Sequence, residues 1–198
     1  YRLSSSGSPV SSFTSNGQVQ LVEVHTGESV PTQIAVNSAT GTLYVPAINN
    51  VRTFSNAGAF SGTLAGAASG VAVSPLNGNV YYGRAAGQGV SHTISVSPSG
   101  VGSFTVPFGT FVRGIAVDLG GRVYVAGRKG TRLYSDTGAF IRVVSPAIGY
   151  GVVVDPSDNS VYVSEGNKVL HFTATGEPAT PVKGVDLTTG RGLAISSI

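Results

Sequence analysis

One short sequence motif occurs five times along the chain and constrains the fold more than any other feature. Its clearest copy is Gly-Ile-Ala-Val-Asp at residues 114–118, followed after a short turn by Val-Tyr-Val at residues 123–125. The copies recur at intervals of about 40 residues, a period typical of architectures in which each repeat is one structural unit. The first halves of the copies occupy residues 33–36, 70–73, 114–117, 151–154 and 192–195.

Each copy continues through a loop, a short segment ending in an aromatic residue, and a turn that contains glycine. In one repeat, residues 131–134 end at Tyr134 and lead to the turn Asp136-Thr137-Gly138, after which residues 139–144 form a fourth segment. Short β-branched and aromatic segments separated by glycine, asparagine and proline predict four strands per repeat. We therefore predict an all-β fold, a β-propeller of four-stranded antiparallel blades. The competing β-sandwich does not need a fixed repeat.

The two ends of the chain fit a circular arrangement of blades. When the first repeat is aligned from its turn at Asn16-Gly17, Tyr1 takes the place of the second-strand tyrosine, while residues 192–195 take the place of a first strand. We predict five blade equivalents in one domain, residues 1–198, with the first strand (strand A) of one blade supplied by the C-terminus. A closed ring of this kind is monomeric, whereas an open ring indicates a piece of a longer chain. The expected blades are residues 192–198 with 1–31, 32–68, 69–112, 113–149 and 150–191.

The repeat resembles the NHL-type repeat of β-propellers, as in bacterial NHL-like repeat proteins. The best copies of Ile-Ala-Val-Asp, a glycine turn and Val-Tyr-Val lie within residues 114–138 and 151–176. The pattern departs from the family at residues 83–92, where a loop is longer, and at Asn37 and Ser74, which replace the usual aspartate. The resemblance implies the fold. It leaves the function open among protein binders, RNA binders, sensor domains and a few lyases and lactonases.

The composition of the chain argues against several classes of protein. The chain has no cysteine, so it has no disulfide or thiolate chemistry. The net charge of +3 comes without clustered Lys and Arg, which argues against a nucleic-acid partner. No apolar stretch is long enough to span a membrane. Few charges in a Ser-, Thr- and Gly-rich chain favour a secreted or surface-displayed bacterial protein. The absence of Met in a chain that starts in mid-blade indicates a processed product or a piece of a longer protein.

The repeat alignment also places the charges. In a propeller, the loops that join successive blades (D–A) and those between the second and third strands (B–C) gather on one face. The positive charge on that face is partly offset by Glu28, Glu165 and Asp186, whereas the opposite face is acidic through Asp118, Asp136, Asp155 and Asp158. Exposed loops are often simply charged, and that interpretation remains open. We predict that a ligand at the mouth of the central channel contacts Arg84, Arg113, Arg128, Lys129, Tyr150 and Arg191.

Neither a metal site nor a cofactor is predicted. A zinc site needs three or four converging ligands, and His25, His92 and His171 fall at three different positions within their blades. A calcium site in the channel needs oxygen ligands, but strand A offers Ile, Ala and Val there. We expect Asn37, Asp118 and Asp155, at the ends of the A strands, to cap tight turns instead.

These observations favour a non-catalytic binding module that recognises a protein, or an acidic glycan or peptide. Two alternatives remain: a metal-dependent propeller enzyme of lyase or lactonase type, and a structural segment of a larger surface protein. Metal analysis of the purified protein distinguishes the metal-dependent enzyme from the binding module. The alignment also predicts that Gly114→Val destabilises the fold by about 1–3 kcal/mol. Arg113→Ala, at a loop position, is expected to change stability by less than about 0.5 kcal/mol.

Overall fold

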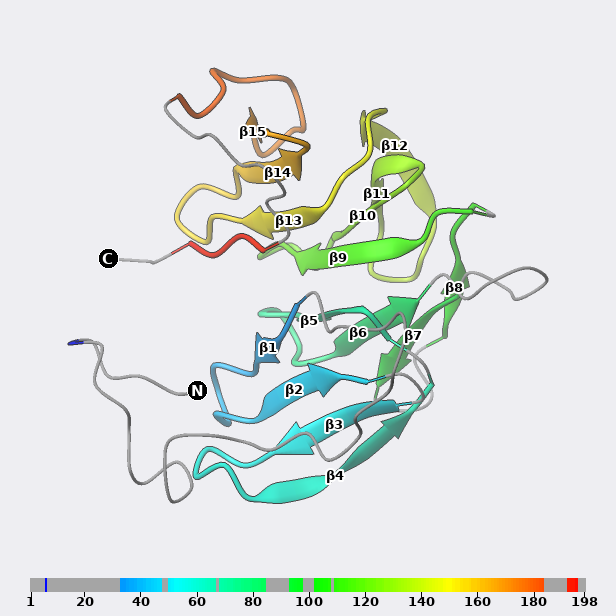
Figure 1. Cartoon of the computed structure of the whole chain (residues 1–198), viewed down its shortest axis with the longest axis vertical. Coiled ribbons are helices and arrows are strands. Elements are labelled where there is room, and N and C mark those ends of the chain that lie inside the picture. Colours follow the sequence, from blue (N-terminus) through cyan, green and yellow to red (C-terminus); the bar gives the residue numbers. More distant parts are fainter. Residues whose placement is uncertain are drawn as a thin grey trace.

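The computed structural model describes residues 6, 33–47, 50–66, 68–84, 93–97, 102–107, 109–183 and 192–195. Within these ranges the fold is all-β, and the strands form four antiparallel sheets arranged around a common axis (Figure 1). Three sheets have four strands and one has three. The sheets are the blades of a β-propeller, which confirms the fold class predicted from the repeat.

Every sheet is a meander whose strands pair in chain order. The first sheet contains β1 (Ala35–Val36), β2 (Leu43–Pro46), β3 (Asn50–Phe54) and β4 (Phe60–Ala65). The second contains β5 (Gly70–Val73), β6 (Val80–Arg84), β7 (Thr93–Ser97) and β8 (Phe104–Thr105). The third contains β9 (Val112–Val117), β10 (Val123–Gly127), β11 (Gly130–Tyr134) and β12 (Phe140–Ser145). The fourth contains β13 (Gly151–Val154), β14 (Val161–Glu165) and β15 (Lys168–Phe172).

The hydrophobic core lies between neighbouring sheets. Alternate residues of a strand point to opposite faces of its sheet. In β10, Val123 and Val125 therefore pack with the second sheet, while Tyr124 and Ala126 pack with the fourth. All four side chains are fully buried, which explains why the strand is an almost continuous apolar run. A third cluster, which includes Val51, Val71 and Tyr82, joins the first sheet to the second.

The first strands of the sheets surround the axis, where β1 contacts β5, β5 contacts β9, and β9 contacts β13. Glycine at the start of these strands permits this close approach. A Cβ atom at Gly70 would lie 3.1 Å from the Ile115 Cγ1 atom, and one at Gly114 would lie 3.1 Å from the Val152 nitrogen. Both contacts are tighter than ordinary van der Waals packing.

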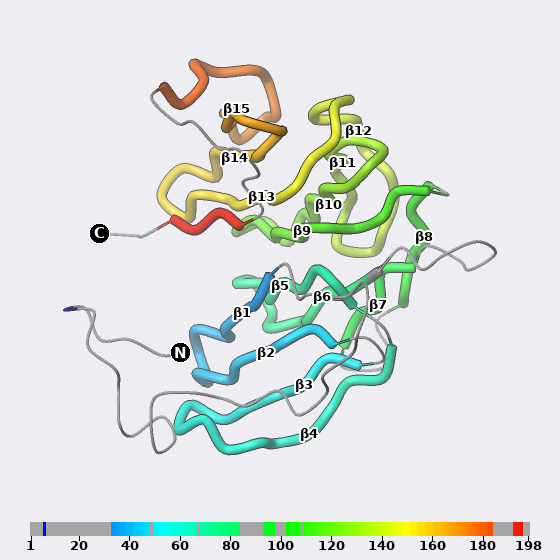
Figure 2. Tube along the Cα trace, viewed as in Figure 1, coloured from blue at the N-terminus to red at the C-terminus, as the bar shows by residue number. Residues whose placement is uncertain are grey.

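The C-terminal segment at residues 192–195 runs beside β13 near the axis (Figure 2) and lines a cavity together with Val152 and Val153. It occupies the position expected of a strand A, but it is not assigned as a strand. Its expected partner near Tyr1 lies outside the described residues, as does the rest of residues 1–31 of the fifth blade equivalent apart from Ser6. The fifth blade therefore stays a prediction.

The fourth sheet has an irregular outer edge in place of a fourth strand. Ala179 donates a backbone hydrogen bond to the carbonyl of His171, and Val182 donates one to the carbonyl of Val169. Phe172 also forms an isolated bridge with Pro178. The sequence has prolines at positions 178 and 181, and a proline has no N–H to donate to a ladder. The segment consequently follows β15 without forming a regular strand.

The turns between first and second strands are capped as predicted. The Asn37 Oδ1 atom accepts the backbone N–H groups of Ala39 and Thr40. Asp118 and Asp155 act in the same way on the turns that follow β9 and β13, accepting the N–H groups of Arg122 and Ser157 respectively. Ser74, at the position where the repeat usually has aspartate, accepts the N–H of Leu76. These side chains are occupied in holding turns.

Candidate functional site

A cavity of about 450 Å³ lies on the propeller axis, at the ends where the first strands begin. Its walls are aliphatic side chains and glycine backbone, apart from one amide and one cation. Arg113 is the charged residue among the described residues of the lining. The lining consists of Gln33, Ile34, Arg113, Gly114, Gly151, Val152, Val153, Gly192, Leu193 and Ala194. Apolar walls with a few polar groups are typical of small-ligand sites of this size.

Arg113 is held in place by an aromatic ring. Its guanidinium carbon lies 4.3 Å from the centre of the Tyr150 ring, a cation–π contact between the third and fourth sheets. Tyr150 is fixed in turn by its backbone N–H, which donates to the Ser164 carbonyl at 2.8 Å. Arg113 is half-buried and its Nη1 atom is fully buried. The loop position expected for Arg113 is therefore wrong, because the residue lies in β9 and its side chain packs at a sheet interface, while the small stability change expected for Arg113→Ala stays a prediction.

Gln33 lines the same cavity and reaches across the axis. Its Nε2 atom donates to the Ile115 carbonyl at 2.7 Å, and its Oε1 atom accepts the Ile115 N–H at 2.8 Å. β9 is an edge strand of its sheet, so these two backbone groups have no strand partner on the axial side. The amide of Gln33 supplies both bonds. The other copies of the repeat have glycine at this position, and the glutamine that replaces it here joins the first sheet to the third.

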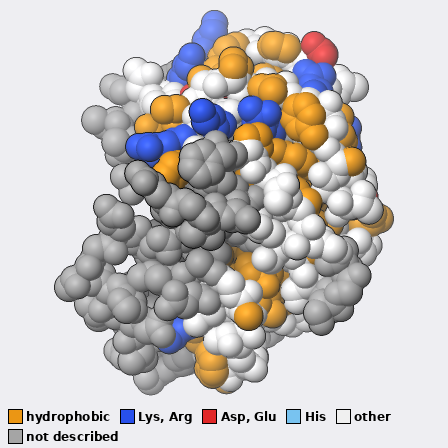
Figure 3. Space-filling view, turned by 90° about the vertical axis from the view of Figure 1, so that its right-hand side faces the viewer, with side chains coloured by type: hydrophobic (Ala, Val, Ile, Leu, Met, Phe, Trp, Pro, Cys, Tyr) orange, Lys and Arg blue, Asp and Glu red, His pale blue; other side chains and the backbone are white. Residues whose placement is uncertain are grey.

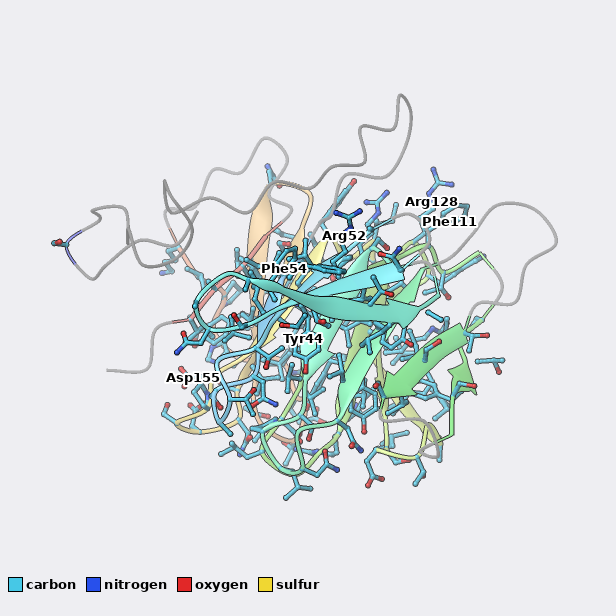
Figure 4. All side chains as sticks on the ribbon, turned by 90° about the horizontal axis from the view of Figure 1, so that it is seen from below. Tyr44, Arg52, Phe54, Phe111, Arg128 and Asp155 are labelled. Carbon is cyan, nitrogen blue, oxygen red and sulfur yellow. The ribbon has the colours of Figure 1, made fainter. Side chains whose placement is uncertain are left out.

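Arg128 and Lys129 form the tip of the turn between β10 and β11, and both are exposed. The guanidinium carbon of Arg128 lies 4.8 Å from the centre of the Phe111 ring. The Lys129 stem passes beside Gly109, since a Cβ atom there would lie 3.4 Å from the Lys129 Cε atom. Figure 4 shows Arg128 and Phe111 together at the rim, on the opposite side of the molecule from Asp155. The two cations thus belong to one D–A and B–C loop pair.

Basic side chains gather in the upper part of the loop face, with hydrophobic side chains between them (Figure 3). Glu165, which the sequence places on this face, is only 5% exposed at the end of β14. Its Oε1 atom has no hydrogen bond to any described residue. Because the carboxylate is buried, it does not present negative charge to a ligand that approaches the described part of the face.

The structure thus brings two pairs of site residues together and leaves others apart. Arg113 contacts Tyr150, whereas Arg128 and Lys129 lie on a separate loop and contact the segment of Gly109 and Phe111. Arg84 ends β6, where it pairs with Thr93, but its side chain is not described. Arg191 lies outside the described residues.

Phe111 was missed by the sequence interpretation, although two signals point to it. It is an aromatic residue two positions before Arg113, and it follows the glycine- and proline-containing loop Pro107-Phe108-Gly109. Apolar residues in loops are easily assigned to the core, and this one is 38% exposed.

The opposite face is acidic, but the carboxylates of Asp118, Asp155 and Asp158 accept hydrogen bonds from their own turns. The Asp118 side chain pairs with the Nε atom of Arg122 at 2.6 Å, and the Arg122 Nη2 atom donates to the carbonyl of Ala174. The Asp158 Oδ1 atom accepts the N–H of Ser160, and this bond lowers the pKa of the carboxyl. A second cavity, of about 410 Å³, lies between the fourth sheet and residues 193–195 and includes Asp155 at its edge.

Among the described residues, no three His, Asp or Glu side chains are grouped closely enough to hold a metal ion. His171 stacks on Tyr162 with ring centres 4.5 Å apart, so it packs on a sheet face. His25 and His92 lie outside the described residues. None of the described segments forms a helix with the length and hydropathy of a transmembrane span.

No protein-family model matches the sequence, and no curated protein matches it at a significant level. The fold is similar to that of a chain in the crystal structure of a nidogen/laminin complex, with a TM-score of 0.58 and 12% sequence identity. The similarity covers 75% of this chain and 61% of that chain, so it spans about three fifths of the neighbour's length. At this identity the match shows the shared fold alone. Fold, sheet order and comparison together define the class of the protein as a β-propeller.

Proposed function

We propose that this propeller is a non-catalytic binding module whose ligand, an anionic protein segment or acidic glycan, binds at the mouth of the central channel. The observation that carries the proposal is the position of Arg113, which lines the axial cavity and is oriented by the Tyr150 ring. A guanidinium fixed beside aliphatic walls favours a carboxylate next to apolar groups, because the charged hydrogen bond gains strength where water is excluded.

Two further features support this function. The basic loop face carries exposed Arg128 and Lys129, while the nearby carboxylate of Glu165 is buried. One structural neighbour is a chain in the crystal structure of a nidogen/laminin complex. The NHL-type resemblance is part of the proposal, since propellers of that type include protein binders. We also propose a secreted or surface location, which rests on the low proportion of charged residues.

The test is titration of the purified protein with a glutamate-rich peptide and, in parallel, with heparin, in buffers of low and physiological salt. Arg113→Gln should weaken binding of at least one of the two by about tenfold, and salt should weaken it further because charged contacts are screened. Arg142→Gln, which removes a cation from β12, is the matched control and should leave binding unchanged. Equal affinity of wild type and Arg113→Gln contradicts the channel-mouth site. Stoichiometric zinc or calcium in the purified protein contradicts the non-catalytic assignment.

A further inference from the structure

Phe111 has a backbone conformation that its residue type rarely adopts. Its φ angle is +45°, in the left-handed region. The other described non-glycine residue with a positive φ is Asn159, a type that tolerates this region and whose Oδ1 atom accepts the N–H of Leu119. Strain of this kind persists only where the surroundings impose it, and it is concentrated at functional sites.

The surroundings impose it through the β10–β11 turn. The backbone N–H of Arg128 donates to the carbonyl of Thr110, and the N–H of Thr110 donates to the carbonyl of Pro107. Gly127 lies so close that a Cβ atom there would be 2.3 Å from the Thr110 carbonyl oxygen and 2.7 Å from that of Phe111. Thr110 is fully buried. The loop is therefore fixed on both sides of Phe111, and its ring is presented outward at the rim.

The ring and its neighbours form a compact amphipathic surface. The Arg128 guanidinium covers one side of the Phe111 ring, and Lys129 belongs to the same turn. The sequence has no Asp or Glu in residues 107–113 or 126–131, so nothing within these two loops neutralises the cations. Aromatic residues and arginines that are already held in position are typical anchors of protein interfaces, because little side-chain entropy is lost on binding.

We propose that Phe111, Arg128 and Lys129 form an anchor for an acidic, extended protein segment, with an aliphatic side chain against the ring and carboxylates on the two cations. The anchor deepens the proposed function and rests on it, since it adds a second contact point outside the channel mouth. The strain at Phe111 is maintained because the anchor needs an outward aromatic ring at this position.

The experiment measures binding of two fluorescent peptides, one alternating glutamate and leucine and one alternating glutamate and glycine. Wild type should bind the leucine peptide more tightly. Phe111→Leu and Arg128→Gln should each weaken that binding by about tenfold or more, the range expected for an interface anchor. Phe140→Leu is the matched control, because Phe140 is also exposed and also lies under an arginine, Arg132, at 5.7 Å, but sits on the outer strand β12. It should leave binding unchanged.

A second variant separates an anchor from a structural residue. Phe111→Gly removes the ring and relieves the positive φ, so it should lose binding while its melting midpoint stays the same or rises by about 2–4 °C. A clear fall in the midpoint contradicts the anchor, because it means that the ring stabilises the loop. Binding that depends on Arg113 but not on Phe111 overturns the anchor and leaves the proposed function intact. Binding of neither peptide overturns the anchor, and it overturns the proposed function as well if heparin also fails to bind. Tighter, Phe111-dependent binding of single-stranded DNA assigns the ring to base stacking and also overturns the anchor.

Discussion

The side chain of Gln33 pairs with the backbone of Ile115 as a neighbouring strand would, through one donated and one accepted hydrogen bond. Ile115 is fully buried, so its N–H and C=O groups depend on this amide. Removing the partner of a buried backbone group costs about 1–3 kcal/mol.

We therefore expect Gln33→Ala to lower the free energy of unfolding by about 1–3 kcal/mol, measured by chemical denaturation. Gln33→Glu keeps an acceptor for the Ile115 N–H but loses the donor, and its effect serves as a comparison. If Gln33→Ala unfolds at the same denaturant concentration as wild type, the prediction is contradicted, because water then replaces the amide without a loss of stability.

Gly114 is the position where an added side chain meets the next blade. A Cβ atom there would lie 3.2 Å from the Gly151 Cα atom as well as 3.1 Å from the Val152 nitrogen. Gly114→Val should destabilise the fold by about 1–3 kcal/mol, as overpacking does. Gly192 is the control from the same repeat position, since no described atom lies within 4 Å of a Cβ there. The packing argument would be contradicted if thermal melts showed that Gly192→Val lowers the stability of the fold as much as Gly114→Val does.

Two arginines of the third sheet join it to the fourth, and they should differ in importance. The side chains of Arg122 and Arg142 are 38% and 34% exposed, but the Asp118 carboxylate of the first pair is fully buried while Glu177 of the second is 65% exposed. Arg122→Ala takes one hydrogen-bond partner from a buried carboxylate and should cost about 1–3 kcal/mol. Arg142→Ala breaks a surface pair and should cost about 1 kcal/mol or less. The prediction would be contradicted if denaturation curves showed that Arg142→Ala is less stable than Arg122→Ala.

Alkaline pH should destabilise the fold through its buried tyrosines. Burial raises the pKa of Tyr81, Tyr82, Tyr124 and Tyr134 above the ordinary value of 10.0. Above about pH 10 the unfolded chain releases these protons while the folded chain keeps them, so stability falls as the pH rises. Below about pH 10 both states are protonated and these groups cause no change. These four are half of the eight tyrosines, so about half of the phenolate absorbance should appear only together with unfolding. Formation of all the phenolate well before the loss of near-ultraviolet circular dichroism would contradict burial as the cause.

Tyr124 gives a sharper form of that prediction. Its hydroxyl is buried and has no hydrogen-bond partner among the described residues. Tyr124→Phe should therefore keep stability within about 0.5 kcal/mol at neutral pH, because no bond is lost and the ring is retained. It should lose less stability than wild type at alkaline pH. The comparison is made by denaturation at both pH values.

The repeat predicted the blades because its signals are local. The alternation of β10 and the carboxylates that follow β9 and β13 act within a few residues, so strand faces and turn caps such as Asp118 and Asp155 could be assigned from the sequence. The axial position of Arg113 also followed from the alignment.

The parts that the sequence did not predict depend on contacts between repeats. The stacking of Arg113 on Tyr150 joins two sheets, and the bond between Gln33 and Ile115 joins the first sheet to the third. The φ angle of Phe111 is set by the turn that contains Gly127. A repeat pattern describes what the copies share, whereas these features arise where one copy differs from the others.

Among the described residues each hydrophobic cluster is shared by two adjacent sheets, so none of the four described sheets has an interior of its own. The four described sheets therefore behave as coupled units, in which opening one sheet removes part of the packing of its neighbours. A contact that skips a neighbour changes this behaviour, since it links the opening of one unit to units beyond the next. The Gln33 amide is such a contact, and it makes separation of the first sheet from the other described sheets more costly than nearest-neighbour packing alone would.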